Sequence, residues 1–186
     1  MIISVASGKG GTGKTTVAVA LAKSVGYCQF IDYDVEAPNA ALFLKPEIKH
    51  VKNITIKQPY FLTGMGKSFK ACADFCHYHA IAAIDSDVMF FDDLCHGCGG
   101  CILVGPEGCV REKDVGIGEV RKGFCLPAIN FLMGDLKPGS MRTTAVQNEL
   151  EKNIDYDSNV IIDCPCLLYT SPSPRDRTRS RMPSSA

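Results

Sequence analysis

The run SGKGGTGKTT, residues 7–16, constrains this chain more than any other segment. It follows a short apolar stretch, residues 2–6, and precedes residues 15–25, whose apolar side chains recur at helical spacing. A glycine, four residues and then Gly-Lys-Thr is the spacing of a phosphate-binding loop between a strand and a helix. Glycines let backbone N–H groups approach phosphate oxygens, and the helix N-terminus favours an anion. The sequence therefore predicts a phosphate site at this loop.

Two side chains of this loop have separate predicted roles. Lys14 brings positive charge to the β- and γ-phosphates of a nucleotide, and the Thr15 hydroxyl can ligate Mg²⁺. A glycine turn that binds nothing would need neither residue. The predicted nucleotide-binding residues are Gly8, Lys9, Gly10, Gly11, Thr12, Gly13, Lys14, Thr15 and Thr16.

A lysine directly after the first glycine limits the protein families that this loop can resemble. With Lys9, the loop resembles the deviant Walker A motif of the MinD/ParA/Mrp family. The resemblance implies a homodimeric ATPase that uses ATP and Mg²⁺, in which Lys9 reaches the nucleotide of the other subunit and Lys14 acts on its own. A solvated loop lysine is the alternative interpretation of Lys9.

An acidic segment follows the second apolar run. Residues 28–31 are predicted to form a strand that ends in Asp32-Tyr33-Asp34. Carboxylates at the carboxyl end of a parallel strand lie beside the nucleotide crevice of an α/β sheet. The segment resembles the family's switch I, which implies that Asp34 orients the attacking water and that Asp32 supports the Mg²⁺ shell. Without the loop upstream, two acids here would be typical of a solvated turn or a helix cap.

A third block, residues 159–163, is a branched apolar run that ends in Asp163. Such a run predicts a buried strand that presents one carboxylate at its end. It resembles a Walker B motif, which implies that Asp163 holds Mg²⁺ through water. Many strands end in aspartate, so the order of the three blocks carries this interpretation.

Cysteines gather in the middle of the chain. Cys95, Cys98 and Cys101 form a Cys-x2-Cys-x2-Cys run, and Cys72 and Cys76 lie upstream with three residues between them. Bacterial ferredoxins use the first spacing to hold iron–sulfur clusters, with the fourth cysteine of each motif ligating the other cluster. The region resembles a two-cluster ferredoxin insert found in one branch of these ATPases.

Three ligand positions of that pattern are missing. Gly66, Phe69 and Gly105 stand where cysteines would be expected, and all three belong with Cys72 to one cluster. The resemblance therefore implies one abolished site and one intact [4Fe–4S] site. The intact site would use Cys76, Cys95, Cys98 and Cys101. Structural zinc on the same four thiolates is the second choice, and a metal-free cysteine cluster is a third.

Composition limits the setting of the protein. Ten cysteines clustered beside a phosphate loop argue for metal in a reducing, cytoplasmic compartment and not for a disulfide scaffold. The formal net charge is zero, and residues 166–186 contribute four arginines against one aspartate, so no basic excess argues for nucleic acid. No apolar run approaches the ~20 residues of a transmembrane helix.

The block order predicts an α/β fold with a mostly parallel sheet and helices on both faces, interrupted by the cysteine-rich insert. The expected parts are residues 1–56 and 114–165 for the ATPase and 57–113 for the ferredoxin-like insert. Residues 166–186 depart from the family pattern and read like one frame of a sequencing adapter. We therefore expect a non-native tail on a chain truncated at its C-terminus.

Three function classes remain at this stage. The first is an ATPase that couples its nucleotide state to the cluster, for cluster transfer, electron transfer or remodelling of a redox or iron–sulfur client protein. The second is a non-catalytic ferredoxin-like electron carrier, or a zinc-stapled binding module, on a nucleotide-binding scaffold. The third is partitioning or positioning on membranes or DNA, which the cysteine insert disfavours.

Overall fold

The structure is a computed structural model that describes residues 1–64, 66–84, 86–125 and 128–166. Apart from Cys166, the expected adapter-derived tail lies outside the described residues. The strands are β1 (Ile2–Ser7), β2 (Tyr27–Asp32), β3 (Glu47–Phe61), β4 (Ile81–Ile84), β5 (Asp87–Phe90), β6 (Val110–Cys125), β7 (Ala128–Leu136) and β8 (Val160–Cys166). The helices are α1 (Lys14–Val25), α2 (Ala40–Leu44), α3 (Lys70–Phe75), α4 (Gly100–Val104), α5 (Thr143–Glu151) and the short 3₁₀ helix η1 (Asp92–Leu94).

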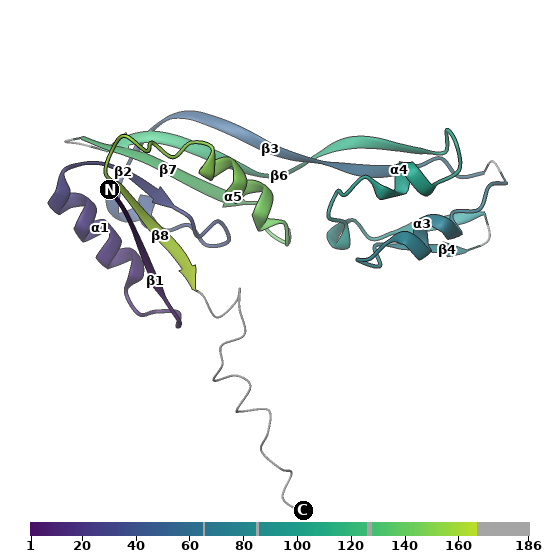
Figure 1. Ribbon diagram of the computed structural model, residues 1–186, viewed down its shortest axis with the longest axis horizontal. Coiled ribbons are helices and arrows are strands. Elements are labelled where there is room, and N and C mark those ends of the chain that lie inside the picture. Colours follow the sequence, from purple (N-terminus) through teal and green to yellow (C-terminus); the bar gives the residue numbers. More distant parts are fainter. Residues whose placement is uncertain (65, 85, 126–127, 167–186) are drawn as a thin grey trace, which may run out of the picture. The chain divides into compact units, whose positions relative to one another are not determined.

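One six-stranded sheet organises the described residues, in the order β1-β8-β2-β7-β6-β3, and β4 and β5 form a separate antiparallel pair (Figure 1). The pairs β1–β8, β8–β2 and β2–β7 are parallel. The strand β6 runs antiparallel to β3, because Lys57 pairs with Asp114 at 3.0 Å and the Leu62 amide donates to the Cys109 carbonyl at 2.8 Å. The predicted α/β class with a mostly parallel sheet is confirmed, and β6 and β3 make the sheet mixed.

The chain divides into two compact units. Unit 1 comprises the described residues of 1–51, 120–135 and 147–166, and unit 2 comprises those of 52–119 and 136–146. The predicted insert boundaries at residues 57 and 113 both fall inside long strands, β3 and β6. None of the helices in the described ranges has the length and apolar character needed to cross a membrane.

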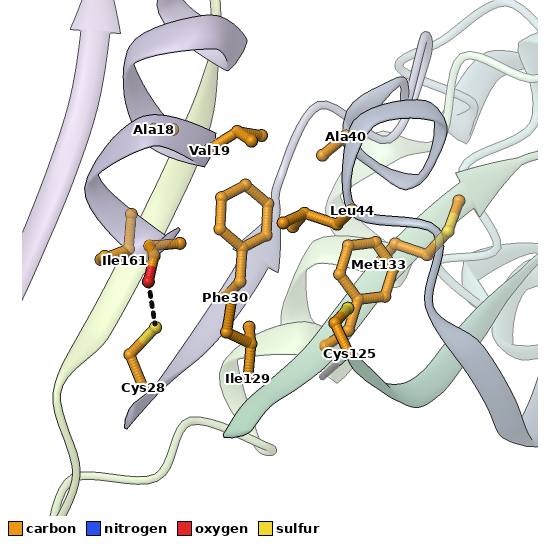
Figure 2. Packing of buried hydrophobic residues seen from close by; sticks show 12 residues of the cluster. Ala18, Val19, Cys28, Phe30, Ala40, Leu44, Cys125, Ile129, Met133 and Ile161 are labelled. Atoms are coloured by element: carbon orange, nitrogen blue, oxygen red, sulfur yellow. Dashed lines mark hydrogen bonds between the residues drawn. The ribbon is translucent and has the colours of Figure 1, made fainter. Parts of the chain in front are cut away.

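In unit 1, α1 packs on β1, β8 and β2 and builds the core that supports the phosphate loop. Its buried side chains Ala18 and Val19 belong to the same cluster as Phe30 of β2 (Figure 2). The ring of Phe30 stacks on that of Phe131 of β7, with centroids 6.0 Å apart. The helix ends at Gly26, whose positive φ of 74° suits a glycine and whose amide donates to the Ala22 carbonyl at 3.0 Å. A buried, close-packed core of this kind holds the ends of the parallel strands in place.

Unit 2 has its own small core, formed by α3, α4 and the β4–β5 hairpin. Phe69 is almost completely buried there, and the ring of Phe61 contacts it edge-on with centroids 5.5 Å apart. The buried members of this cluster are Phe69, Cys72, Ile81, Cys101, Cys109 and Val110. Three of the ten cysteines, Cys72, Cys101 and Cys109, thus contribute directly to the packing of unit 2.

Candidate functional site

The carboxyl ends of three parallel strands bring the predicted acidic residues together in unit 1. In the strand register, Asp163 of β8 pairs with Val5 of β1 on one side and with Asp32 of β2 on the other. Because β1 leads directly into the glycine loop, both carboxylates lie at the sheet edge that carries this loop.

The glycine loop has the geometry that its sequence predicts. Gly11 and Gly13 adopt positive φ angles of 73° and 84°, which side chains with a Cβ rarely tolerate. The hydroxyls of Ser7 and Thr12 lie 2.7 Å apart, and both lie within hydrogen-bonding distance of the Lys9 carbonyl oxygen, so one hydroxyl donates to this oxygen and the other donates to its neighbouring hydroxyl or to the same oxygen. These bonds fix the turn, and α1 begins immediately after Gly13.

A pocket of about 410 Å³ opens at this loop. Most of its lining was predicted from the sequence, and Asn39, Phe43 and Cys166 were not. The lining residues are Gly10, Gly11, Thr12, Gly13, Lys14, Thr15, Thr16, Asp34, Asn39, Phe43 and Cys166. Two predicted residues, Gly8 and Lys9, are not among them, and Lys9 is exposed. The loop, Lys14, Thr15 and Asp34 are therefore brought together around one cavity.

Asp163 is a buried carboxylate with unused hydrogen-bonding capacity. Its side chain is 1% exposed, and its Oδ1 atom finds no hydrogen-bond partner in the described part of the chain. Burial raises the pKa of this carboxyl, whereas a hydrogen bond with the Thr15 side chain and the charge of Lys14 lower it. A buried oxygen without a partner is costly unless a cation or water satisfies it. The donor set of Asp163 and Thr15 therefore fits Mg²⁺.

Asp32 is fully buried, and its carboxylate accepts backbone hydrogen bonds that its sequence context does not predict. Its Oδ2 atom accepts hydrogen bonds of 3.0 Å from the amides of Asn39 and Ala40, and its Oδ1 atom accepts one of 3.3 Å from the Asp34 amide. These bonds hold the acidic loop and the start of α2. Asp32 therefore shapes the segment that presents Asp34 to the pocket.

The pH dependence of stability follows from Asp32. Burial raises the pKa of its carboxyl from 3.8 to about 7, so between these values the folded chain keeps a proton that the unfolded chain has released. The stability from this group is fully present below the unfolded pKa and is lost as the pH rises through the folded one. We expect a loss on the order of a few kcal/mol across this range.

Urea unfolding of the metal-free and nucleotide-free chain at several pH values measures this loss. Asp32→Asn cannot titrate, so its free energy of unfolding should depend less steeply on pH. An equally steep dependence in the variant would contradict the assignment.

Tyr33 makes a contact that the sequence did not suggest. Its hydroxyl donates a 2.6 Å hydrogen bond to Glu151 Oε1 at the end of α5. Burial and this contact with Glu151 raise the pKa of Tyr33 above its ordinary value. The bond ties the acidic loop to a helix more than a hundred residues away, and no local pattern could have indicated it.

In unit 2, the four predicted cluster ligands come from short elements and glycine turns. Cys76 directly follows α3, and Cys95 directly follows η1. Cys98 is exposed in the turn between η1 and α4, and Cys101 lies in α4. The Ala80 amide donates to Cys76 Sγ, and the Gly97 amide donates to Cys95 Sγ, each at 3.4 Å. Backbone N–H groups thus already point at two of the four sulfur atoms.

The same thiols lie close enough to influence one another. Burial raises the pKa of Cys101 to about 11, and neighbouring thiols add to the rise: Cys72, Cys98 and Cys76. Burial also raises the pKa of Cys95, with contributions from Cys98 and Cys76. All ten cysteines are free thiols, and among the described residues no three ligand side chains converge on a point that could hold a single metal ion.

Three positions of the second, incomplete ligand set, Phe69, Cys72 and Gly105, are closely packed in the core of unit 2. Phe69 is 1% exposed in the core of unit 2, and Cys72 is fully buried beside it. A Cβ atom at Gly105 would lie 2.5 Å from Val110 Cγ2, 2.6 Å from the Cys101 carbonyl oxygen and 3.0 Å from Cys72 Sγ. There is therefore no room for a cysteine at Gly105 in this fold.

Gly105→Ala is expected to destabilise the chain by about 1–3 kcal/mol, because the added methyl group must displace backbone and core atoms. Gly116→Ala is the matched control, since a Cβ at Gly116 meets nothing within 4 Å. Thermal unfolding of both variants checks this difference. Equal stabilities would show that the space around Gly105 can relax.

A glycine loop at a helix N-terminus, with buried carboxylates on neighbouring parallel strands, defines a P-loop nucleotide-binding α/β domain. The chain belongs to the CobQ/CobB/MinD/ParA nucleotide binding domain family (CbiA), which matches residues 3–164. This match confirms, at the level of the family, the resemblance to MinD and ParA proteins that Lys9 and the glycine loop indicate. It also confirms the prediction of a nucleotide-binding domain.

One relative is an uncharacterized protein, MJ0579, of Methanocaldococcus jannaschii. It is 28% identical to this chain over 171 aligned residues, which cover 84% of this chain and 59% of the relative. The chain thus spans about three fifths of the length of this relative.

Proposed function

We propose that this chain is an ATPase whose nucleotide site is coupled to one [4Fe–4S] cluster. One observation carries the ATPase part. Thr15 lines the phosphate pocket, and its side chain lies close enough to Asp163 to lower the pKa of that carboxyl, whose Oδ1 atom has no partner among the described residues. A threonine hydroxyl and a strand-end aspartate are the pair that holds Mg²⁺ beside ATP in P-loop enzymes.

Each residue of the site has a role in this proposal. The loop amides bind the phosphate oxygens, and Lys14 neutralises the negative charge that develops during transfer. Thr15 and Asp163 hold Mg²⁺, which would screen the phosphate charges when bound. Asp34 lines the pocket and positions the attacking water. Asp32 accepts hydrogen bonds from three backbone amides of the acidic loop and the start of α2, and in this proposal it supports the magnesium shell by fixing that segment.

The proposed cluster ligands are Cys76, Cys95, Cys98 and Cys101. Two observations support them: their thiols influence one another's pKa, and backbone amides donate to the sulfur atoms of Cys76 and Cys95. N–H groups directed at ligand sulfur atoms tune the potential of iron–sulfur clusters. A bound cluster would supply one-electron chemistry or would itself be the cargo passed to a client.

The packing of unit 2 also favours one cluster over two. Buried Phe69 and the tight contacts at Gly105 occupy the positions that a second cluster would need. Cys72 is then a buried thiol of the core and not a ligand.

Zinc on the same four thiolates is the alternative metal. A zinc site needs four sulfur atoms about 2.3 Å from one centre. The spacing of the cysteines favours the iron–sulfur assignment, because zinc sites more often use two separated Cys-x2-Cys pairs than one Cys-x2-Cys-x2-Cys run.

The proposal includes a homodimer and a reducing environment. Lys9 is exposed at the rim of the loop, where its ammonium group is available to the nucleotide of a second copy. Free thiols throughout the chain suit the cytoplasm, where a redox or iron–sulfur client protein would be met.

Anaerobic purification of the full chain tests both parts of the proposal. The expected results are Mg-dependent release of phosphate from ATP and bound iron accompanied by acid-labile sulfide. Zinc without sulfide would overturn the cluster, and a preparation that does not bind Mg-ATP would overturn the ATPase.

A further inference from the structure

The short turn before Cys95 is held from three directions in unit 2. The carbonyl oxygen of Asp92, which begins η1, accepts the Cys95 amide at 3.1 Å. The same oxygen also accepts a hydrogen bond of 3.3 Å from Nε2 of the buried Gln58 of β3 and another from Nη2 of Arg142. Three hydrogen-bond donors on one carbonyl oxygen restrict the movement of this loop.

Arg142 contacts this turn a second time. Its Nε atom donates to the Cys95 carbonyl oxygen at 2.5 Å, so one guanidinium group bridges the carbonyls at both ends of the turn. The planar fork of arginine suits such a bidentate contact, and lysine cannot reproduce it.

The backbone that carries Arg142 is itself anchored within unit 2. The Lys137 amide donates to the Ile117 carbonyl of β6 at 2.8 Å, and the Ser140 amide donates to the Lys137 carbonyl at 3.0 Å. The Arg142 amide then contacts Ser140 Oγ at 3.4 Å. Arg142 therefore reaches the Cys95 turn from a fixed base.

Gly97, two residues after Cys95, packs directly on β3. A Cβ atom at this position would lie 2.7 Å from the Lys57 carbonyl oxygen, so the turn cannot move toward the strand. Arg142 and β3 both restrict the turn, and the hydrogen bond from the Gly97 amide to Cys95 Sγ gives the Cys95 thiol a defined direction.

From these contacts we infer that Arg142 is a positioning residue for the cluster site. It fixes the turn that carries Cys95, and its permanent positive charge would stabilise the more negative, reduced form of a bound cluster. This inference rests on the proposed function, because it assigns Arg142 a role toward the cluster proposed above. Neither the spacing of the cysteines nor the family motif suggests this residue.

Arg142→Gln and Arg142→Lys test the inference in the full chain, with Arg111→Gln as the control. Arg111 is exposed on β6, so its replacement removes one positive charge from unit 2 without touching the Cys95 turn. Circular dichroism of each variant verifies folding.

The first measurement uses metal-free protein. Iodoacetamide should alkylate Cys95 faster in Arg142→Lys than in wild type or Arg111→Gln, because the turn is released while the positive charge that lowers the pKa of Cys95 is kept. Peptide mass spectrometry reads this rate at Cys95 itself.

The second measurement uses protein reconstituted with iron and sulfide. Both Arg142 variants should lose iron to a chelator about 10-fold faster than wild type, the size expected for a residue that orients a ligand. Arg142→Gln should also lower the midpoint potential in a dithionite titration, while Arg142→Lys, which keeps the charge, should stay near wild type.

The two possible failures are distinguishable. Wild-type alkylation of Cys95 in Arg142→Lys would overturn the inference, whatever the metal content. Absence of iron and sulfide from wild-type protein would overturn the proposed cluster and, with it, the role of Arg142 toward that cluster.

Discussion

Replacing Lys14 by alanine is expected to reduce ATP hydrolysis by at least about 100-fold and to weaken binding of Mg-ATP. Lys14 lies in the phosphate pocket, and its charge also acts on the carboxyl of Asp163. Removing one preorganised group that faces developing negative charge typically costs 10²- to 10³-fold in turnover. The variant also leaves the buried carboxylate of Asp163 without a compensating cation.

Phosphate release and equilibrium binding of Mg-ATP measure the two effects separately. Lys23→Ala is the matched control, because Lys23 is an exposed lysine in the last turn of the same helix, α1. Asp34→Asn adds a further distinction, since a residue that positions water should lose turnover and retain binding. Undiminished hydrolysis in Lys14→Ala would exclude the proposed ATPase site. If the protein were instead a non-catalytic electron carrier, it would hydrolyse no ATP and would retain its redox behaviour in every variant.

Replacing Cys98 by serine is expected to remove most of the bound iron and sulfide, with loss of the visible absorption of the cluster. A serine hydroxyl is a much poorer ligand for iron than a thiolate, and the remaining three thiols leave one iron open. Cys98 is exposed, so its replacement should disturb the packing of unit 2 less than replacement of the buried ligands.

Cys72→Ala and Cys109→Ala are the controls for this experiment. Both thiols are buried in the core of unit 2, and neither belongs to the proposed ligand set. We expect both variants to keep their iron and sulfide after anaerobic purification. Retention by Cys98→Ser together with loss in Cys72→Ala would assign the cluster to a different ligand set.

Local spacing explains why much of the nucleotide site could be predicted. The loop glycines, Lys14 and Thr15 act within one strand–turn–helix unit, and the structure brings the loop and Asp34 to one pocket. The contributions of Asn39 and Phe43 to the same pocket were not predictable. They depend on how α2 folds back against the loop, which the amides bound to Asp32 decide.

The cysteine region divides in the same way. The spacing of Cys95, Cys98 and Cys101 predicts a ligand run, because such runs need only a short turn and a helix start. The lengths of β3 and β6 were not indicated, because the spacing of the cysteines says nothing about the strands on either side of them. The tight space at Gly105 was also invisible, because it arises from contacts with Val110 and with the thiol of Cys72.

The sequence by itself determined the order of the phosphate loop, the acidic loop and the terminal strand, and with it the family and the parallel part of the sheet. It did so because each motif is short and carries its chemistry in neighbouring residues. Only the tertiary structure decided that Asp163 keeps an oxygen without a partner among the described residues, that Asp32 holds the acidic loop and that Arg142 reaches Cys95. These features depend on burial and on contacts between residues far apart in the chain, and no local pattern encodes such contacts.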